Sequence, residues 1–271
     1  MNLRNLLFVP GTKTELLVKV PRWSPDVVIV DLEDAVPPAE KDAARRAVAE
    51  ADFSEAGTTV LVRINPPGTP WHELDIAACL GTAAAGIVLP KGEDPGEVAA
   101  LADRLDKAAP DVGLVVGIES ALGVARARDL LTTGVSAAFF GSEDFLADMG
   151  GRRSPSGLEV LYARSEVVLA GRLAGVPMID QAVVAVEDDA AFTADAETGR
   201  ALGFVGKICV HPRQVALAHA VFTPSEEEVA AARKVLAAEA SGVAVVDGLM
   251  VDAVHIRMAR QVLEAFEEGD R

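Results

Sequence analysis

Eight short apolar runs, each followed by a polar or turn-forming residue, constrain the fold of this 271-residue chain more than any other feature. They occupy residues 6–9, 27–30, 59–62, 86–89, 114–118, 137–140, 177–180 and 205–210. Continuous apolar runs of this length are typical of parallel strands that are buried on both faces. Helical patterns lie between many of them, at 12–20, 39–51, 95–108, 121–131, 155–175 and 188–202. Eight strand-then-helix units predict an α/β fold, a (β/α)8 TIM barrel, over residues 1–222.

Residues 223–271 predict a helical extension or lid beyond the barrel. A helix that opens with the capping-box pattern Thr223-Pro224-Ser225-Glu226 is expected to run to about residue 240. A glycine-containing loop at 241–251 then leads to Asp252, and a last helix is expected at 253–268. An acid beyond the closed barrel has no evident core role, so we expect Asp252 to belong to a lid or to a neighbouring subunit.

Charge and cysteine content narrow the class of protein. The 25 Lys and Arg residues against 41 Asp and Glu give a net charge of -16, which argues against a surface for nucleic acid or anionic membrane. Cys79 and Cys209 lie in apolar runs without metal or redox spacing, so they fit a reducing compartment. No apolar run approaches the roughly 18 residues of a membrane span. We therefore expect a soluble, cytoplasmic protein that binds neither nucleic acid nor membrane.

Two acids follow two neighbouring strands of the predicted barrel. Glu119 comes directly after the run 114–118, and Asp144 closely follows the run 137–140. The carboxyl ends of parallel strands carry the chemistry of α/β folds, so these carboxylates are candidate ligands of Mg²⁺, with water and substrate in the other positions. The alternative is that each acid only caps the helix after it, because acids are favoured at helix N-termini.

A cluster of acids ends the second predicted strand, and basic residues end the next two. Asp31, Glu33 and Asp34 are so close that their mutual repulsion calls for a cation or an arginine nearby. Arg63 could form a structural ion pair, or it could grip a carboxylate or a developing oxyanion with two donors. Lys91 could likewise bind a ligand group or serve as a counter-charge.

Lys13 and Lys19 follow the first predicted strand and its Pro10-Gly11 turn. They mark either an anion-binding corner or the solvated start of a basic helix, and the residue pattern does not decide between the two.

Eight motifs, taken in order along the chain, carry a resemblance to a known family. They are LLFVPG (6–11), VVIVDLEDAV (27–36), VRIN (62–65), VLPK (88–91), GIESALG (117–123), FGSEDFLADMGGRR (140–153), GKICVHP (206–212) and GLMVD (248–252). With them the chain resembles the citrate lyase β-subunit-like proteins of the HpcH/HpaI aldolase superfamily over nearly its whole length. The resemblance implies a TIM barrel that binds Mg²⁺ and makes or breaks a C–C bond between an acyl-CoA and a 2-oxo acid. Malyl-CoA and citramalyl-CoA lyases are the activities most similar to this expectation.

The same resemblance implies roles for individual residues. Glu119 and Asp144 match the metal ligands, and Arg63 matches the arginine that grips the oxo acid or the enolate oxygen. Asp252 matches the acid/base that a neighbouring subunit lends to the site. Asp31 and Glu33 match acids around the metal-bound waters. The substrate and CoA site is further expected to include Phe8, Pro10, Lys13, Lys19, Lys91, Gly141 and Ser142.

Three other functions remain open alongside an acyl-CoA lyase. A CoA-independent 2-oxo-3-deoxy acid aldolase would use the metal pair without the basic residues Lys13 and Lys19. A citrate lyase β subunit would act on an acyl-carrier-protein thioester. A metal-binding scaffold would keep the barrel without turnover. The implied lent acid makes a homo-oligomer, a trimer or a hexamer, the expected assembly.

Overall fold

The computed structural model describes residues 2–238 and 243–269, and the chain divides into two compact units. The first runs from Leu3 to Ala218, and the second begins at His219. The division lies inside helix α9 (Arg213–Phe222).

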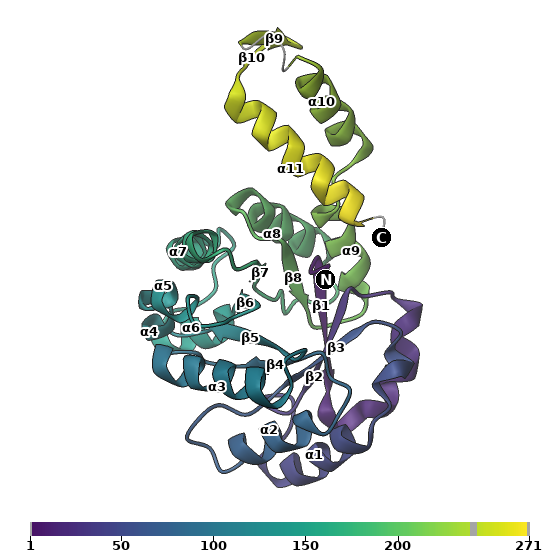
Figure 1. Ribbon diagram of the computed structural model, residues 1–271, viewed down its shortest axis with the longest axis vertical. Coiled ribbons are helices and arrows are strands. Elements are labelled where there is room, and N and C mark those ends of the chain that lie inside the picture. Colours follow the sequence, from purple (N-terminus) through teal and green to yellow (C-terminus); the bar gives the residue numbers. More distant parts are fainter. Residues whose placement is uncertain (1, 239–242, 270–271) are drawn as a thin grey trace. The chain divides into compact units, whose positions relative to one another are not determined.

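The first unit is a closed barrel of eight parallel strands, which neighbour one another in the order of the sequence (Figure 1). The strands are β1 (Asn5–Pro10), β2 (Val27–Asp31), β3 (Thr59–Arg63), β4 (Gly86–Leu89), β5 (Gly113–Ile118), β6 (Ala137–Phe140), β7 (Met178–Asp180) and β8 (Gly206–Cys209). The helices of this unit are η1 (Gly11–Arg22), η2 (Pro38–Glu40), α1 (Lys41–Glu50), η3 (Phe53–Ala56), α2 (His72–Leu80), α3 (Pro95–Ala108), α4 (Ala121–Ala125), α5 (Ala127–Leu130), α6 (Ser142–Met149), α7 (Leu158–Ala174), α8 (Asp189–Leu202) and the part of α9 up to Ala218. The predicted α/β class and TIM-barrel fold are confirmed.

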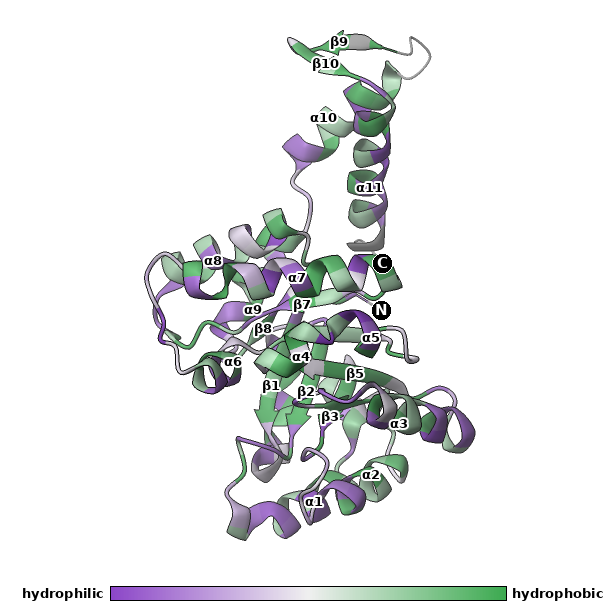
Figure 2. Ribbon diagram, turned by 90° about the vertical axis from the view of Figure 1, so that its left-hand side faces the viewer, coloured by the Kyte–Doolittle hydropathy of each residue, from purple (hydrophilic) through white to green (hydrophobic). Residues whose placement is uncertain are grey.

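The barrel strands are apolar because the core covers one face and the helices cover the other. Figure 2 shows hydrophobic strands surrounded by helices in which hydrophobic and hydrophilic residues mix. The core cluster takes residues from all eight strands: Leu6, Val27, Ile29, Leu61, Val88, Val115, Ala137, Phe139, Ile179 and Ile208. Successive strand residues point to opposite faces, so residues two positions further on share the inner face. This alternation places Asp31, two residues after Ile29, and Arg63, two residues after Leu61, at the inner face near the carboxyl end of the barrel.

A buried ionic network lies on the outer face of the last two strands. Lys207 of β8 donates to the carboxylates of Asp180 (2.8 Å) and Asp195 (2.5 Å). Arg164 of α7 donates to the same two carboxylates, at 2.7 Å to Asp180 Oδ2 and 3.1 Å to Asp195 Oδ1. The side chains of Lys207 and Asp180 are fully buried, and each has an oppositely charged partner, as buried charges require.

Two of the expected helices of the barrel have a different form. The helix expected at 12–20 is the 3₁₀ helix η1, which contains Pro21 and a non-helical residue at Lys13. The helix expected at 121–131 is divided into α4 and α5, because the backbone of Arg126 leaves the helical region with φ −103° and ψ 7°.

The second unit consists of α10 (Glu226–Ala237), the antiparallel hairpin β9 (Ala244–Val246) and β10 (Leu249–Val251), and α11 (Ala253–Gly269). α10 packs against α11. The capping box is made by Ser225 and Glu228, so the expected start of this helix at Thr223 was two residues too early. The end expected near residue 240 lies outside the described residues.

The expectation of a loop at 241–251 was wrong for its described part, because residues 244–251 form the hairpin. Its turn residues, Asp247 (φ 49°) and Gly248 (φ 83°), both have positive φ. Asp-Gly between apolar residues is a hairpin signal, since a two-residue type I′ turn needs positive φ at both positions.

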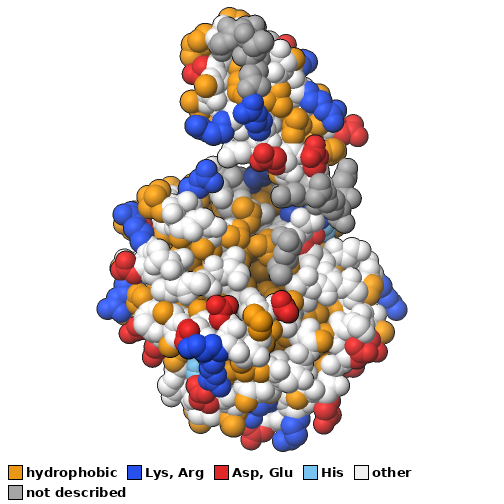
Figure 3. Space-filling view, in the orientation of Figure 1, with side chains coloured by type: hydrophobic (Ala, Val, Ile, Leu, Met, Phe, Trp, Pro, Cys, Tyr) orange, Lys and Arg blue, Asp and Glu red, His pale blue; other side chains and the backbone are white. Residues whose placement is uncertain are grey.

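Cys79 and Cys209 are buried thiols, and burial raises the pKa of each to about 12. Such thiols are poor nucleophiles and weak metal ligands, which fits a packing role. Within the described residues, no helix has the length and apolar character to cross a membrane. On the face drawn in Figure 3, basic side chains are dispersed among acidic ones and form no continuous basic surface.

Candidate active site

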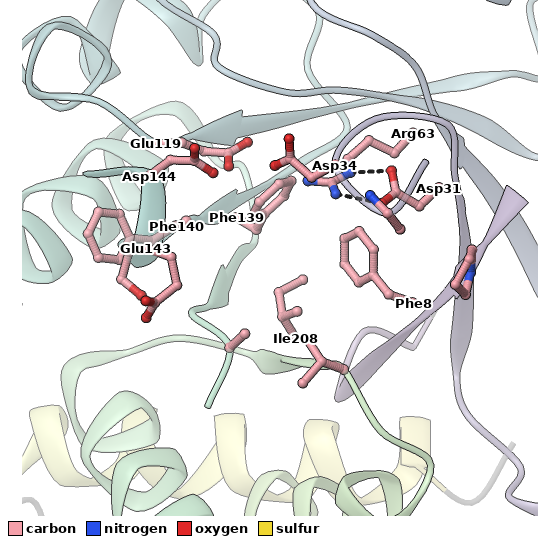
Figure 4. Close-up of a pocket in the computed structure, with 16 residues that line it drawn as sticks. Phe8, Asp31, Asp34, Arg63, Glu119, Phe139, Phe140, Glu143, Asp144 and Ile208 are labelled. Carbon is pink, nitrogen blue, oxygen red and sulfur yellow. Dashed lines mark hydrogen bonds and ion pairs between the residues drawn. The ribbon is translucent and has the colours of Figure 1, made fainter. Parts of the chain in front are cut away.

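A cavity of about 410 Å³ lies at the carboxyl end of the barrel strands, and core residues Phe139 and Ile208 form part of its wall (Figure 4). The residues that line it are Phe8, Pro10, Asp31, Asp34, Ala35, Arg63, Glu119, Phe139, Phe140, Gly141, Ser142, Glu143, Asp144, Ala182, Ile208 and Val210. The structure therefore brings together most of the predicted site residues, which come from the ends of β1, β2, β3, β5 and β6. Glu33 and Lys91 contact this lining through their side chains.

Arg63 forms a two-point ion pair with Asp31 at the wall of the cavity (Figure 4). Its Nε donates to Asp31 Oδ1 and its Nη2 to Oδ2, both at 2.7 Å. The Asp31 carboxylate also accepts from the backbone N–H groups of Glu33 (2.9 Å) and Ala35 (3.0 Å). Asp31 is 1% exposed and has four donors around it, so it orients Arg63 and shapes the turn after β2.

The structural ion pair expected as one role of Arg63 is thus present. It does not use all the N–H donors of the guanidinium. Nη1 lies 2.9 Å from Glu33 Oε2 as an ion pair, although among the described residues that oxygen accepts no hydrogen bond. A guanidinium has five N–H donors, and the two hydrogen bonds to Asp31 use one on Nε and one on Nη2, so three on Nη1 and Nη2 are not engaged by Asp31. Burial acts to lower the pKa of Arg63, but Asp31, Glu33 and Glu119 together outweigh it, so the group stays charged.

Lys91 connects the acids after β2 with the acids after β5 and β6. Its Nζ lies 2.7 Å from Glu33 Oε1, 3.5 Å from Asp144 Oδ1 and 3.8 Å from Asp34 Oδ2. Its backbone has φ 52°, an uncommon conformation for a residue with a side chain, and its N–H donates to Glu119 Oε1 at 3.2 Å. Burial raises the pKa of Glu33, and Arg63 and Lys91 offset part of that rise. The acid cluster therefore has the positive partners that its repulsion demands.

A buried lysine beneath this cluster was not predicted from the sequence. Lys41 Nζ donates to the carbonyl oxygens of Leu32 (2.7 Å) and Glu33 (2.7 Å) and to Asn65 Oδ1 (2.6 Å). Asn65 Nδ2 in turn donates to Leu32 O (2.9 Å) and Asp75 Oδ2 (2.6 Å). These two side chains donate hydrogen bonds to the carbonyl oxygens of the turn that carries Glu33. The VRIN motif contains Asn65, but only the fold shows that Lys41 reaches it.

Glu119 is 3% exposed, and two glycines make room for its side chain. A Cβ at Gly117 would lie 2.1 Å from Glu119 Oε1, and a Cβ at Gly141 would lie 2.6 Å from Oε2. Burial raises the pKa of Glu119 to about 8, with Glu33 and Asp144 adding to the rise and Arg63 opposing it. The N-cap of α4 is Ser120, whose Oγ accepts from Gly123 N–H, so Glu119 does not cap that helix.

Asp144 lies in the first turn of α6, and its side chain is 37% exposed. Figure 4 shows its carboxylate next to that of Glu119 in the cavity. Two carboxylates with nearby space for water or substrate are the oxygen donors that Mg²⁺ takes in proteins. Among the described residues no three His, Cys, Asp or Glu side chains converge as a metal cage, so a bound ion here would depend on non-protein ligands as well. The donor set fits Mg²⁺.

Five predicted site residues are absent from this lining. Glu33 and Lys91 contact residues of the lining, whereas Lys13 and Lys19 are exposed on η1. Asp252 belongs to the second unit, where it caps α11: its Oδ1 accepts from Val254 N–H at 2.9 Å and contacts His255 Nδ1 at 2.8 Å. The hydrogen bond to His255 is the largest of the contacts that lower the pKa of Asp252.

A closed (β/α)8 barrel with paired carboxylates and an arginine in one strand-end cavity defines a class of TIM-barrel enzymes. The family model for HpcH/HpaI aldolase/citrate lyase matches residues 4–212, and a second model, for a C–C bond lyase of the TIM-barrel fold, matches residues 164–267. The chain therefore belongs to the HpcH/HpaI aldolase/citrate lyase family, and it is a carbon–carbon bond lyase. The family and the enzyme class predicted from the sequence are confirmed.

Known proteins resemble the chain over almost its full length. A citrate lyase subunit β-like protein of Deinococcus radiodurans is 42% identical, with 96% of both chains covered. A (3S)-malyl-CoA thioesterase of Cereibacter sphaeroides is 34% identical, with 97% of this chain and 94% of the relative covered. The solved structure of CitE from Mycobacterium tuberculosis in complex with magnesium, acetoacetate and coenzyme A superposes with a TM-score of 0.84, at 31% identity and 98% coverage of both chains.

Proposed function

We propose that this protein cleaves, or in reverse forms, a 3-hydroxyacyl-CoA of the malyl-CoA or citramalyl-CoA type, with an acyl-CoA and a 2-oxo acid as the products. The observation that carries the proposal is the meeting of Glu119, Asp144 and Arg63 in one cavity. The M. tuberculosis structure with magnesium, acetoacetate and coenzyme A, and the malyl-CoA thioesterase relative, support the same substrate class.

Glu119 and Asp144 would hold Mg²⁺, which the related CitE structures contain. The ion, when bound, supplies Lewis acidity to the substrate hydroxyl oxygen that becomes the ketone. The carboxylate of Glu119 must be ionised to serve as a ligand. Its ordinary pKa is raised by burial, so a divalent charge beside it restores the ionised form.

Arg63 would stabilise the negative charge that develops when the C–C bond breaks. The electron pair of that bond becomes the enolate of the acyl thioester, and its oxygen needs preorganised donors. The N–H groups on Nη1 and Nη2 that do not bind Asp31 would serve this purpose, while the two hydrogen bonds to Asp31 hold the guanidinium in place. Asp31 is then a positioning residue, and the buried Glu33 would hold Lys91 beside Asp144, since Lys91 Nζ lies 2.7 Å from Glu33 Oε1 and 3.5 Å from Asp144 Oδ1.

Asp252 of a neighbouring subunit would exchange the proton at the enolate carbon, as acid in cleavage and base in condensation. This role implies a homo-oligomer, a trimer or a hexamer. The basic residues Lys13 and Lys19 are exposed on η1, and we assign them to the phosphate groups of CoA outside the cavity. Phe8, Pro10, Gly141 and Ser142 line the cavity and would contact the acyl and oxo-acid parts.

A screen of malyl-, citramalyl- and methylmalyl-CoA with Mg²⁺, which follows release of glyoxylate or pyruvate, tests the reaction. Calorimetric Mg²⁺ titration tests the site, with Glu119→Gln and Asp144→Asn expected to lose both metal binding and activity while remaining folded. If both variants bind Mg²⁺ with unchanged affinity, the assignment of Glu119 and Asp144 as metal ligands is wrong. If none of the thioesters in the screen releases an oxo acid, the proposed substrate class is wrong.

A second candidate is a citrate lyase β subunit that acts on an acyl-carrier-protein thioester. It is favoured by citrate lyase β subunits of Leuconostoc mesenteroides and Escherichia coli, which are 33% and 34% identical to this chain. Activity with a citryl thioester on acyl-carrier protein, and none with free CoA thioesters, would select this function.

A further inference from the structure

The first turn of α6 carries Asp144 but has no cap of its own. The N-cap residue is Gly141, which has no side chain to satisfy the free N–H groups at the start of the helix. Among the described residues, the side-chain contact of Asp144 is an ion pair with Lys91 at 3.5 Å, which is longer than a hydrogen bond that would fix the carboxylate. Contacts from outside the helix can therefore contribute to the orientation of this turn.

Arg153 is the side chain that holds this turn. Its Nε donates to Glu143 Oε1 at 2.7 Å, and its Nη2 donates to Ser142 Oγ. Its Nη1 donates to Gln181 Oε1 at 3.2 Å. Ser142 and Gln181 are 2% and 1% exposed, so the guanidinium joins two buried side chains and one exposed carboxylate. Asp144 directly follows Glu143, so these contacts clamp the turn on which Asp144 sits.

The far end of the clamp is anchored in the sheet. Gln181 Nε2 donates to both oxygens of Asp195, at 3.0 and 3.3 Å. Asp195 accepts in turn from the buried Lys207 and Arg164. Because the Gln181 amide donates to Asp195, its oxygen is directed to Arg153, so the orientation of the amide is determined by the network. A chain of hydrogen bonds thus runs from β8 to the first turn of α6.

We propose that Arg153 is a positioning residue for the metal site, which fixes the first turn of α6 and so the Asp144 carboxylate relative to Glu119. The proposal rests on the proposed function of Glu119 and Asp144 as Mg²⁺ ligands. Metal sites need ligands held within about 0.5 Å, and loss of a partner in the outer shell typically lowers metal affinity by 10- to 100-fold. The ion pair with Glu143 alone is solvent-exposed and would contribute little to the stability of this turn.

The chain offers a matched control beside Arg153. Arg152 is exposed and makes no hydrogen bond or ion pair with any residue that the structure describes. Arg152→Ala removes the same charge from the same loop without touching the clamp.

The experiment is Mg²⁺ titration calorimetry on the full chain, together with hydrogen–deuterium exchange of the metal-free protein. Arg153→Ala should weaken Mg²⁺ binding by about 10-fold or more. Arg153→Lys, which can reach fewer of the three acceptors, should weaken it less. Arg152→Ala should remain within about 2-fold of wild type. Exchange in residues 142–149 should accelerate in Arg153→Ala, and turnover should recover at saturating Mg²⁺, unlike in Glu119→Gln.

The outcomes separate this inference from the proposed function. If Glu119→Gln loses Mg²⁺ binding while Arg153→Ala binds as wild type or leaves the exchange of 142–149 unchanged, Arg153 is not a positioning residue and the metal assignment stands. If Arg152→Ala weakens binding as much as Arg153→Ala, the effect is one of loop charge, and the clamp is wrong. If Glu119→Gln binds Mg²⁺ as wild type does, the proposed function is wrong, and the proposed role of Arg153 is wrong as well.

Discussion

At the scale of single residues, Arg63 has two roles. It forms ion pairs with buried acids, and it is proposed to bind the ligand. Asp31 accepts from Nε and Nη2, and Glu33 Oε2 lies 2.9 Å from Nη1 as an ion-pair partner. A lysine at this position keeps the charge but cannot hold Asp31 in two places and still reach into the cavity. We expect Arg63→Lys to lower turnover by about 10²-fold, on the scale of losing one transition-state donor.

The control for this prediction is Asp31→Asn, which breaks the ion pair but keeps the arginine. Steady-state kinetics and thermal unfolding of both variants separate the two roles. If Arg63→Lys turns over at a rate near wild type, the donors of Arg63 do not contact the transition state. If both variants lose stability equally and activity equally, Arg63 acts only through its ion pair.

The site residues that could be predicted from the sequence are those that directly follow a predicted strand. Glu119 and Arg63 each follow an apolar run, so a parallel barrel necessarily brings them to one end. Lys41, Gln181 and Arg153 could not be predicted in the same way. Lys41 lies within a helical pattern and Arg153 within a loop, and their partners are determined by the packing of loops that are distant in sequence.

At the scale of elements, β5 and β6 accommodate Glu119 only because each ends near a glycine. We expect Gly117→Ala to displace the Glu119 carboxylate, because the new Cβ would lie 2.1 Å from Oε1 and 2.6 Å from the Phe139 ring. Overpacking of this kind costs about 1–3 kcal/mol of stability, and Mg²⁺ affinity should fall as well. Calorimetric titration and urea unfolding measure the two effects.

Gly81→Ala is the matched control for this element. Its Cβ would meet nothing closer than Ala78 O at 3.4 Å, and the φ of Gly81 is −88°, which alanine adopts readily. This variant should bind Mg²⁺ as wild type does. Wild-type Mg²⁺ affinity in Gly117→Ala would show that Glu119 is not held by the two glycines or is not a ligand.

Helices and strands could be predicted where one sequence pattern was clear and its ends were marked. The strands β4 and β6 and the helix α3 begin and end where their sequence patterns do, because glycine, proline or polar residues bound each run. The hairpin β9–β10 was missed because its strands are three residues long, although Asp247-Gly248 carries the turn signal. The 3₁₀ form of η1 has no sequence period of its own, since it depends on local kinks at Lys13 and Pro21.

At the scale of the whole molecule, the ionic network outside β7 and β8 should make stability depend on pH. Burial acts to raise the pKa of Asp195, but Lys207 and Arg164 outweigh it, so the pKa lies below its ordinary value of 3.8. A carboxyl group with a lowered pKa in the folded state stabilises the fold above its unfolded pKa, and this contribution is lost as pH falls through the folded value.

We therefore expect Asp195→Asn to lower the free energy of unfolding by about 3 kcal/mol at pH 7, because it leaves buried cations with one partner fewer. The difference from wild type should shrink as pH falls below 3.8, where Asp195 itself becomes neutral. Urea unfolding between pH 2.5 and 7 measures this difference. A constant difference across that range would contradict the electrostatic account.

The role of Asp252 belongs to the assembly and not to one chain, and complementation tests it. Asp252 caps α11, and asparagine is as good an N-cap as aspartate, so Asp252→Asn removes the acid without removing the cap. It should therefore fold and bind Mg²⁺ normally, while turnover falls by roughly 10²- to 10⁴-fold. Mixing it with inactive Glu119→Gln, after subunit exchange, should create sites that take Glu119 from one chain and Asp252 from the other. Activity should then partly return. If native mass spectrometry shows mixed oligomers and activity stays at the level of the separate variants, Asp252 is not lent between subunits.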